Sequence, residues 1–188
     1  SLEPRKNLKT LLQAFANYVT HHAGGEWLII AGGKGWLNDD LSQVAAELGI
    51  AERVKFLGYV QEADLRVLYS AAMLFVYPSI YEGFGLPPLE AMACGAPVIT
   101  SNTSALPEVV GDDALLIDPH SSKALYQAME RVLSDDALRW RMRQQSLARA
   151  TLFSWERTAE ETLAVYEEVC PEHAKETRTA RIGRKIRQ

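Results

Sequence analysis

Short apolar runs alternate with helix-period stripes along most of this 188-residue chain, and this alternation constrains the fold more than any other feature. An apolar run without polar alternation is typical of a strand buried on both faces of a parallel sheet. The pattern therefore predicts an α/β fold, a Rossmann-like parallel sheet with helices on both faces. The runs expected to form strands are residues 27–31, 54–57, 73–77, 97–100 and 114–117.

Helical stripes fill the segments between these runs and continue after the last one. Each places apolar residues three or four positions apart, so that one face of a helix is apolar. Ser154 is a good residue for the first cap of the final helix. The expected helices cover residues 8–19, 41–48, 61–71, 86–94, 121–133 and 136–150, followed by one that begins at Ser154.

The sequence begins with a helix, whereas a parallel α/β domain normally opens with a strand. Residues 1–4 lead almost directly into the first helical stripe. We therefore expect the first strand to be truncated and one domain to cover residues 1–170, with residues 171–188 as a basic tail. The sheet edge left open by that strand is a candidate for self-association.

The net charge of −4 is distributed unevenly. Residues 171–188 contain six Lys and Arg against two Glu, which leaves residues 1–170 with a net charge of −8. An acidic body argues against nucleic acid as a partner. A solvated tail is the expectation for residues 171–188, with peripheral contact to an anionic membrane as the alternative.

Cysteine and histidine are too sparse for a disulfide framework or a metal site. Cys94 and Cys170 are the two cysteines, and the four histidines show no ligand spacing with them or with one another. A cytoplasmic setting and a site without a metal are therefore expected.

The segment from Pro78 to Glu90 carries the strongest chemical signal. A predicted buried strand runs into a glycine loop and then into a helix with two prolines in its first turn. We expect Gly83 and Gly85 to let the backbone turn sharply and to let a ligand approach. The free N–H groups and positive dipole end of such a helix suit a phosphate, although the spacing fits neither a dinucleotide nor a phosphate-loop motif.

Two carboxylates bracket this loop with E-x7-E spacing, Glu82 before the helix and Glu90 within it. We place Glu90 in the first turn, where an acid also has a purely structural use as a helix cap. Glu82 follows a buried strand in an apolar, Gly-rich loop, so we expect its carboxylate to accept hydrogen bonds from sugar hydroxyls.

This spacing resembles the E-x7-E motif of the retaining, two-domain (GT-B) glycosyltransferases known as glycosyltransferase family 4, or group 1. Further stretches resemble that family in the same order along residues 1–170: residues 3–8, 54–60, 90–99, 106–110 and 153–156. The resemblance implies the C-terminal, donor-binding half of such an enzyme, inactive alone because the acceptor-binding half lies outside it.

The resemblance also implies roles for individual residues. Glu82 contacts the donor sugar, Lys6 neutralises the diphosphate and Glu90 accepts the ribose hydroxyls. The family's second cation would fall six residues before Lys6, outside this sequence, and a donor role for Arg5 is as compatible with the sequence as a solvated position. Backbone or supporting contacts to the donor are assigned to Gly83, Phe84, Gly85 and Leu86, to Tyr59 and Val60 near the base, and to Glu108 near the phosphates.

The reaction implied is transfer of a sugar from a nucleoside diphosphate to an acceptor hydroxyl, with retention and with neither metal nor cofactor. The resemblance of residues 3–7 to mannosyltransferases of polysaccharide assembly favours GDP-mannose as donor and a glycan or lipid-linked glycan as acceptor. Two alternatives stay open: a nucleotide-sugar epimerase of the same fold, and a nucleotide-sugar-binding domain without catalysis.

Overall fold

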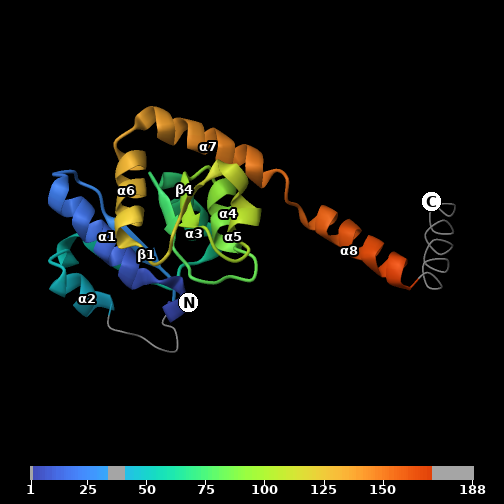
Figure 1. The fold of residues 1–188 in the computed structure, drawn as a ribbon, viewed down its shortest axis with the longest axis horizontal. Helices are drawn as coiled ribbons and strands as arrows, with labels where there is room; N and C mark the ends of the chain where they lie inside the picture. Colours follow the sequence, from blue (N-terminus) through green and yellow to red (C-terminus); the bar gives the residue numbers. More distant parts are fainter. Residues whose placement is uncertain (1, 34–40, 171–188) are drawn as a thin grey trace. The chain divides into compact units, whose positions relative to one another are not determined.

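The computed structural model describes residues 2–33 and 41–170, so the expected tail at residues 171–188 lies outside the described residues. The chain divides into two compact units, Ser1–Ala150 and Thr151–Gln188. The first unit contains every strand of the described chain and most of its helices (Figure 1). Each unit is described by itself.

The strands confirm the α/β fold, with every strand pair parallel. Their hydrogen bonds form two sheets among the described residues, β1-β2 and β3-β4-β5. The strands are β1 (Leu28–Ala31), β2 (Val54–Gly58), β3 (Phe75–Tyr77), β4 (Val98–Ser101) and β5 (Leu115–Ile117).

Every expected helix of the first unit is present within a few residues of its expected bounds. One further helix, α5, was not expected, because five residues are too few to show a helical period. The helices are α1 (Leu8–His21), α2 (Leu41–Glu47), α3 (Glu62–Ala71), α4 (Leu86–Ala93), α5 (Leu106–Val110), α6 (Ser122–Leu133) and α7 (Asp136–Ala150), with short 3-10 turns η1 (Pro4–Lys6), η2 (Ala51–Arg53) and η3 (Gly111–Asp113).

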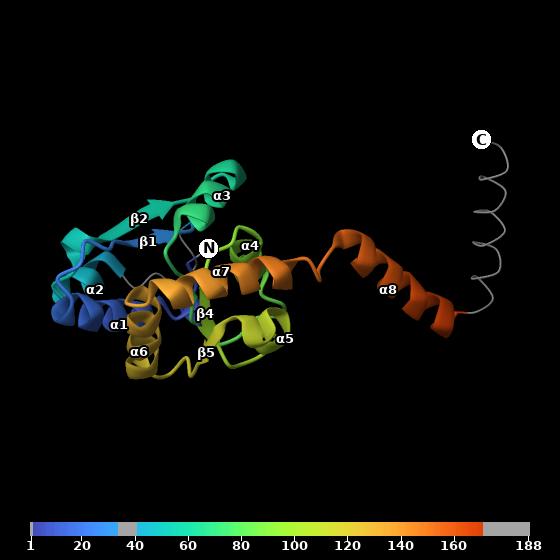
Figure 2. The same ribbon diagram turned by 90° about the horizontal axis from the view of Figure 1, so that it is seen from above.

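Strand β4 shows how the three-stranded sheet is covered on both faces. Ile99 belongs to a core cluster with α1 and α6, which lie side by side in Figures 1 and 2. Its neighbour Val98 belongs to a second cluster with α3, α4 and α5. Because successive side chains of a strand point to opposite faces, the two clusters lie on opposite sides of the sheet. All four residues of β4 are buried, as a central parallel strand requires.

Strand β1 departs from the expectation of burial on both faces. Ile30 is buried against α1 and α6, whereas Ile29 is 41% exposed. Leu57 on the paired strand β2 is 43% exposed. The described helices therefore cover one face of the β1-β2 sheet well and leave apolar side chains on its other face accessible to water.

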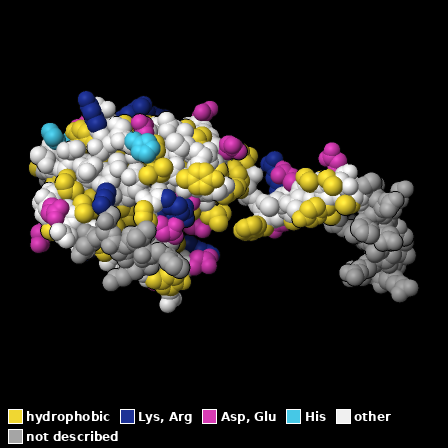
Figure 3. All heavy atoms as spheres, turned by 60° about the horizontal axis from the view of Figure 1, so that its bottom comes forward, with side chains coloured by type: hydrophobic (Ala, Val, Ile, Leu, Met, Phe, Trp, Pro, Cys, Tyr) yellow, Lys and Arg dark blue, Asp and Glu magenta, His cyan; other side chains and the backbone are white. Residues whose placement is uncertain are grey.

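The second unit contains one described helix, α8 (Trp155–Val169). The hydroxyl of Ser154 accepts a hydrogen bond from the Arg157 N–H at 3.1 Å, which confirms the expected cap. No residue of α8 is buried and Trp155 is 78% exposed, and exposed apolar side chains follow the helix in Figure 3. Among the described residues, no helix combines the length and apolar character needed to cross a membrane.

Asn7 joins the N-terminal segment to the ends of two strands. Its side-chain amide donates to the carbonyl oxygens of Pro78 at 3.1 Å and Pro119 at 2.7 Å, which follow β3 and β5. Its backbone is left-handed, with φ of 57°, a conformation that asparagine tolerates better than most residues. This side chain therefore helps to hold η1 at the ends of β3 and β5.

We predict that Asn7→Gly lowers the free energy of unfolding by roughly 1–3 kcal/mol, because two buried carbonyls lose their donor. Asn7→Ala should cost about 1 kcal/mol more, since alanine also resists the left-handed backbone. Urea unfolding measures both, with exposed Asn17→Ala on α1 as the control. Wild-type stability of the glycine variant would show that these hydrogen bonds do not stabilise the fold.

Candidate functional site

The connection from β3 to α4 requires glycine at one position. Gly85 precedes α4 with φ of 114°, and a Cβ there would lie 2.8 Å from Cδ2 of Leu106. Proline at the start of α4 loses no intrahelical hydrogen bond. The expected strand, glycine loop and helix are therefore confirmed, with the N-terminus of α4 at the carboxyl end of the sheet.

Gly83 differs from Gly85: the backbone bends at Gly83 as expected, but without the positive φ that would require glycine. Gly83 has no positive φ, and nothing lies within 4 Å of the position where its Cβ would be. Open space, and not a strained turn, surrounds this residue. The adjacent side chains of Phe84 and Leu86 are exposed, so this part of the loop faces solvent.

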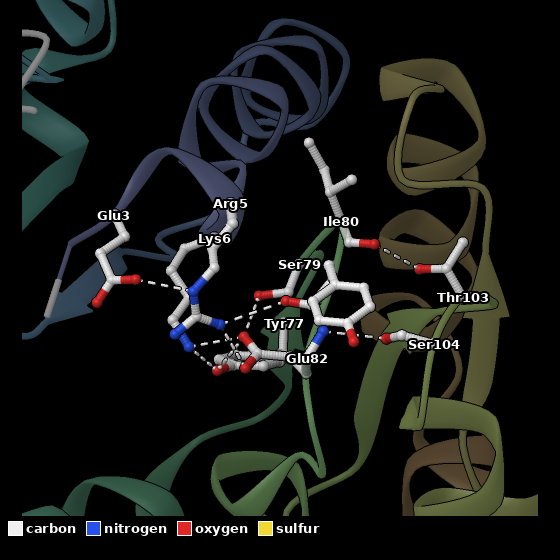
Figure 4. Close-up of polar contacts among 10 residues, drawn as sticks. Glu3, Arg5, Lys6, Tyr77, Ser79, Ile80, Glu82, Thr103 and Ser104 are labelled. Atoms are coloured by element: carbon white, nitrogen blue, oxygen red, sulfur yellow. Dashed lines mark hydrogen bonds and ion pairs between the residues drawn. The ribbon is translucent and has the colours of Figure 1, made fainter.

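The carboxylate of Glu82 lies at the centre of a polar cluster (Figure 4). Its Oε2 accepts from Arg5 Nη1 at 2.5 Å, and its Oε1 accepts from Lys6 Nζ at 2.7 Å. The hydroxyls of Tyr77 and Ser79 each donate to the same Oε1 at 2.8 Å. The Glu82 side chain is 10% exposed, so an isolated charge here would be costly without these partners.

Opposing effects set the pKa of this carboxyl group. Burial alone would raise the pKa of Glu82, but hydrogen bonds from Lys6, Ser79, Tyr77 and Arg5 outweigh burial and lower it to about 2. Burial and the adjacent carboxylate raise the pKa of Tyr77, which keeps its hydroxyl protonated as a donor. Glu82 is therefore a fixed negative charge at neutral pH.

Segments far apart in the sequence build this cluster. Arg5 and Lys6 lie in η1, and the Arg5 carbonyl accepts a hydrogen bond from the Ile80 N–H at 2.8 Å. On the other side of the loop, the Ser104 hydroxyl accepts from the Glu82 N–H at 3.1 Å (Figure 4). The loop that carries Glu82 is thus held both by η1 and by the residues before α5.

Three members of the cluster were missed from the sequence: Tyr77, Ser79 and Ser104. Tyr77 ends an apolar strand and resembles a core residue in the sequence. Ser104 has a left-handed backbone, with φ of 54°, in a segment where no helix was expected. The one available signal was the position of Tyr77 and Ser79 directly before Glu82, at the carboxyl end of a parallel strand, where ligands bind in such sheets.

Glu90 lies apart from this cluster, and its expected place in the first turn of the helix is wrong. It is the fifth residue of α4, and the first turn contains no acidic residue. Its Oε2 accepts a hydrogen bond from the Tyr69 hydroxyl at 3.3 Å, and the residue is otherwise exposed. A cap to the first N–H groups is therefore not its use in this structure.

Tyr59 and Val60 lie in the turn after β2, beside a shallow hollow of about 470 Å³. The hollow continues along α3, and Tyr59 is 82% exposed. An accessible ring on such a turn suits stacking against a planar group. The further residues that line the hollow are Leu57, Gln61, Asp64, Val67 and Leu68.

Glu108 is exposed in the first turn of α5, and its backbone carbonyl accepts from Arg149 Nη2 at 2.6 Å. The hydrogen bonds that reach the Glu82 loop from this side come from Ser104 and from the Thr103 hydroxyl, which donates to the Ile80 carbonyl at 3.0 Å. Within residues 2–33 and 41–170, no three His, Cys, Asp or Glu side chains gather as metal ligands would. The role of Glu108 near the donor phosphates stays a prediction, and so does the expectation that the site needs no metal.

Comparison with known proteins identifies the family of this chain. The family model described as "Glycosyl transferases group 1" matches residues 1–149. O-antigen chain mannosyltransferase B from Escherichia coli is 46% identical over 167 residues, which are 88% of this chain and 44% of that protein. The chain belongs to the group 1 glycosyltransferases.

Solved structures extend the likeness to the fold. The C-terminal domain of a group 1 glycosyl transferase from Francisella tularensis superposes with a TM-score of 0.71 at 26% identity, over 80% of each chain. HepE from Anabaena, in complex with UDP, gives a TM-score of 0.77 at 26% identity, over 89% of this chain and 46% of that one. This group 1 chain thus spans less than half the length of its curated relative and matches the C-terminal part of a GT-B fold.

Gly83 and Gly85, which lie in the loop between β3 and α4, make a matched pair for mutation. We predict that Gly85→Ala lowers the free energy of unfolding by roughly 1–3 kcal/mol, since alanine adds backbone strain and a contact with Leu106. Gly83→Ala should change it by less than about 0.5 kcal/mol. Denaturant unfolding of both variants measures the difference, and equal effects would contradict it.

The lowered pKa of Glu82 predicts a pH-dependent stability. Its ionised form stabilises the fold fully above the ordinary pKa of 4.5, and this contribution is lost as pH falls towards the folded pKa of about 2. The stability difference between wild type and Glu82→Gln should therefore shrink by roughly 3 kcal/mol from pH 6 towards pH 2. Denaturant unfolding at several pH values measures this, and a constant difference would refute the lowered pKa.

Proposed function

We propose that this group 1 chain is the donor-binding half of an enzyme that transfers mannose from GDP-mannose to an acceptor hydroxyl, with retention at the anomeric carbon. The observation that carries the proposal is the cluster of Glu82, Lys6 and Arg5 beside the N-terminus of α4. The 46% identity to an O-antigen mannosyltransferase supports mannose and polysaccharide assembly.

The two cations of the cluster suit the leaving group of such a reaction. Lys6 and Arg5 lie beside the loop before α4. Leu86 supplies the first N–H group of this helix, because the next two residues are prolines and have none. A diphosphate placed there meets two positive side chains and the positive end of a helix dipole. These groups stabilise the charge that develops on the diphosphate as the sugar bond breaks.

The hydrogen-bond inventory of Glu82 indicates how the donor sugar is accommodated. A carboxylate offers about four acceptor positions, two on each oxygen. Lys6, Tyr77 and Ser79 all donate to Oε1, whereas among the described residues only Arg5 donates to Oε2, so a sugar hydroxyl can bond the remaining position of Oε2. Arg5 can also give way there, because its side chain is 41% exposed, against 16% for Lys6, and keeps a second partner in Glu3 at 2.7 Å.

Glu90 and Tyr59 supply the remaining contacts to the nucleotide in this proposal. The exposed Glu90 carboxylate, held at one oxygen by Tyr69, accepts the ribose hydroxyls. Tyr59 and Val60 hold the base at the hollow after β2. The acceptor, a glycan or lipid-linked glycan at the cytoplasmic face of a membrane, binds to the half of the enzyme that this chain does not cover, so the chain alone transfers no sugar.

The test uses the complete polypeptide with GDP-mannose and an acceptor glycan. Glu82→Gln should lower kcat/KM by at least 100-fold, about 3 kcal/mol, while GDP affinity measured by calorimetry changes less than threefold. Glu90→Gln should weaken GDP binding by about 1–3 kcal/mol, and exposed Glu52→Gln is the matched control. Glu82→Gln activity within threefold of wild type, in a variant that unfolds cooperatively, would refute the proposal.

The same complete polypeptide tests which nucleotide the donor carries and whether the anomeric configuration is retained. GDP should stabilise the protein against heat more than UDP at equal concentration, and NMR of the product should show the anomeric configuration of the donor. Stabilisation by UDP alone, the nucleotide present in the HepE complex, would overturn GDP-mannose. An inverted product would overturn retention and leave the donor site intact.

A further inference from the structure

Three aromatic side chains form a packed row beside α4. The ring of Tyr69, from α3, meets the ring of Phe75 edge to face, with centroids 5.2 Å apart and ring planes at 87°. Phe75 in turn stacks against Tyr77, with centroids 6.0 Å apart and planes at 20°. Phe75 and Tyr77 are two positions apart on β3, so both point to the same face of this strand. The row therefore runs from α3 along β3.

Each end of this row holds one carboxylate of the E-x7-E pair. The Tyr77 hydroxyl donates to Glu82 Oε1 at 2.8 Å. At the other end, the Tyr69 hydroxyl donates to Glu90 Oε2 at 3.3 Å. Burial, together with the neighbouring carboxylate, raises the pKa of both phenols, so each hydroxyl keeps the proton that it donates. The two glutamates are thus connected through one set of packed rings.

Tyr77 also contacts a cation of the site. Lys6 Nζ donates to the Tyr77 hydroxyl oxygen and lies 4.7 Å from the centroid of the ring, over its face. A phenol carries one proton and also accepts through its oxygen, so Tyr77 can accept from Lys6 while it donates to Glu82. The orientation of this one ring therefore influences where both the lysine and the carboxylate lie (Figure 4).

Phe75 lies between the two tyrosines and is itself held by the sheet. It is paired with Val98 of β4, and its N–H donates to the Pro97 carbonyl at 2.8 Å. A phenylalanine side chain has no hydrogen-bonding group, so its ring can act on the two carboxylates only through its packing against the tyrosines. A smaller side chain at this position would leave a gap and let both tyrosine rings move.

We infer that Phe75 is a positioning residue for both halves of the donor site. Its packing fixes the rings of Tyr69 and Tyr77. The Tyr77 hydroxyl then orients Glu82, and in the same way the Tyr69 hydroxyl orients Glu90. The inference rests on the proposed function, in which one glutamate contacts the donor sugar and the other the ribose. Tyr77 then serves the transfer step, Tyr69 serves nucleotide binding, and Phe75 serves both.

The test measures two quantities in the complete polypeptide: kcat for transfer from GDP-mannose, and the Kd of GDP by calorimetry. Tyr77→Phe should lower kcat by at least about tenfold and change the Kd of GDP by less than about twofold. Tyr69→Phe should raise the Kd of GDP by at least about threefold and change kcat by less than about twofold. Phe75→Leu, which keeps an apolar side chain but removes the ring, should produce both losses.

Two matched controls separate positioning from general stability. Tyr126→Phe removes a hydroxyl that donates to Glu130 at 2.7 Å, which is a tyrosine-glutamate bond on α6. Phe15→Leu removes a buried core ring that stacks on Tyr18 with centroids 6.4 Å apart. Both controls should leave kcat and the Kd of GDP within about twofold of wild type, even where the Phe15 variant lowers Tm.

Wild-type kcat and GDP affinity in Phe75→Leu would overturn the inference, and so would equal losses in Phe15→Leu. If Phe75→Leu does not unfold cooperatively, Phe75→Met replaces it, because the flexible methionine side chain fills more of the gap, and must show the same double loss. A wild-type enzyme that does not bind GDP or transfer mannose counts against the proposed function instead. The same variants are then measured with the nucleotide and donor that the wild type uses, and the inference stands or falls on the same pattern.

Discussion

The buried charge of Glu82 ties the candidate site to the fold, because its compensating partners come from a distant part of the chain. The Glu82 carboxylate is stable in its position because Lys6 and Arg5 come from η1, more than seventy residues earlier in the chain. The same short segment holds the ends of β3 and β5 through Asn7 and the end of β1 through Leu2. Moving η1 would therefore leave an unpaired charge and loosen the carboxyl edge of both sheets at once.

Periodicity predicted most of the fold because each element buries a face whose spacing is visible in the sequence. The stripe of α1 and the apolar run of β4 both lie in the core as expected. The exposure of Ile29 and the division into two sheets were not visible, because both depend on what lies beside β1 in space. A run such as Trp27 to Ala31 is equally apolar whether one or both of its faces are covered.

Residues of the candidate site were predictable where their chemical type and their spacing in the sequence both pointed to a role. Residues that join the site only through tertiary contacts were not predictable. E-x7-E identified Glu82, and the resemblance of residues 3–8 to a known family identified Lys6. Tyr77 and Ser79 have no spacing signal, since only the folded course of the chain after β3 brings the Glu82 carboxylate back to their hydroxyls. For Glu90 the position expected from the sequence was wrong. An acid in the first turn of a helix suggested a cap, but Glu90 lies beyond the first turn of α4, where it accepts a hydrogen bond from Tyr69.

The uneven pairing of the Glu82 carboxylate has an energetic consequence for the proposed donor site. Four donors fix the side chain before any ligand arrives, so little conformational entropy is lost when a sugar binds. In the proposed enzyme, a hydroxyl that bonds Oε2 shares this oxygen with Arg5 or takes its place, and a displaced guanidinium keeps Glu3 or gains a phosphate. In the same proposal, the contact between the cations and the departing diphosphate strengthens as charge develops, and transition-state stabilisation would arise there.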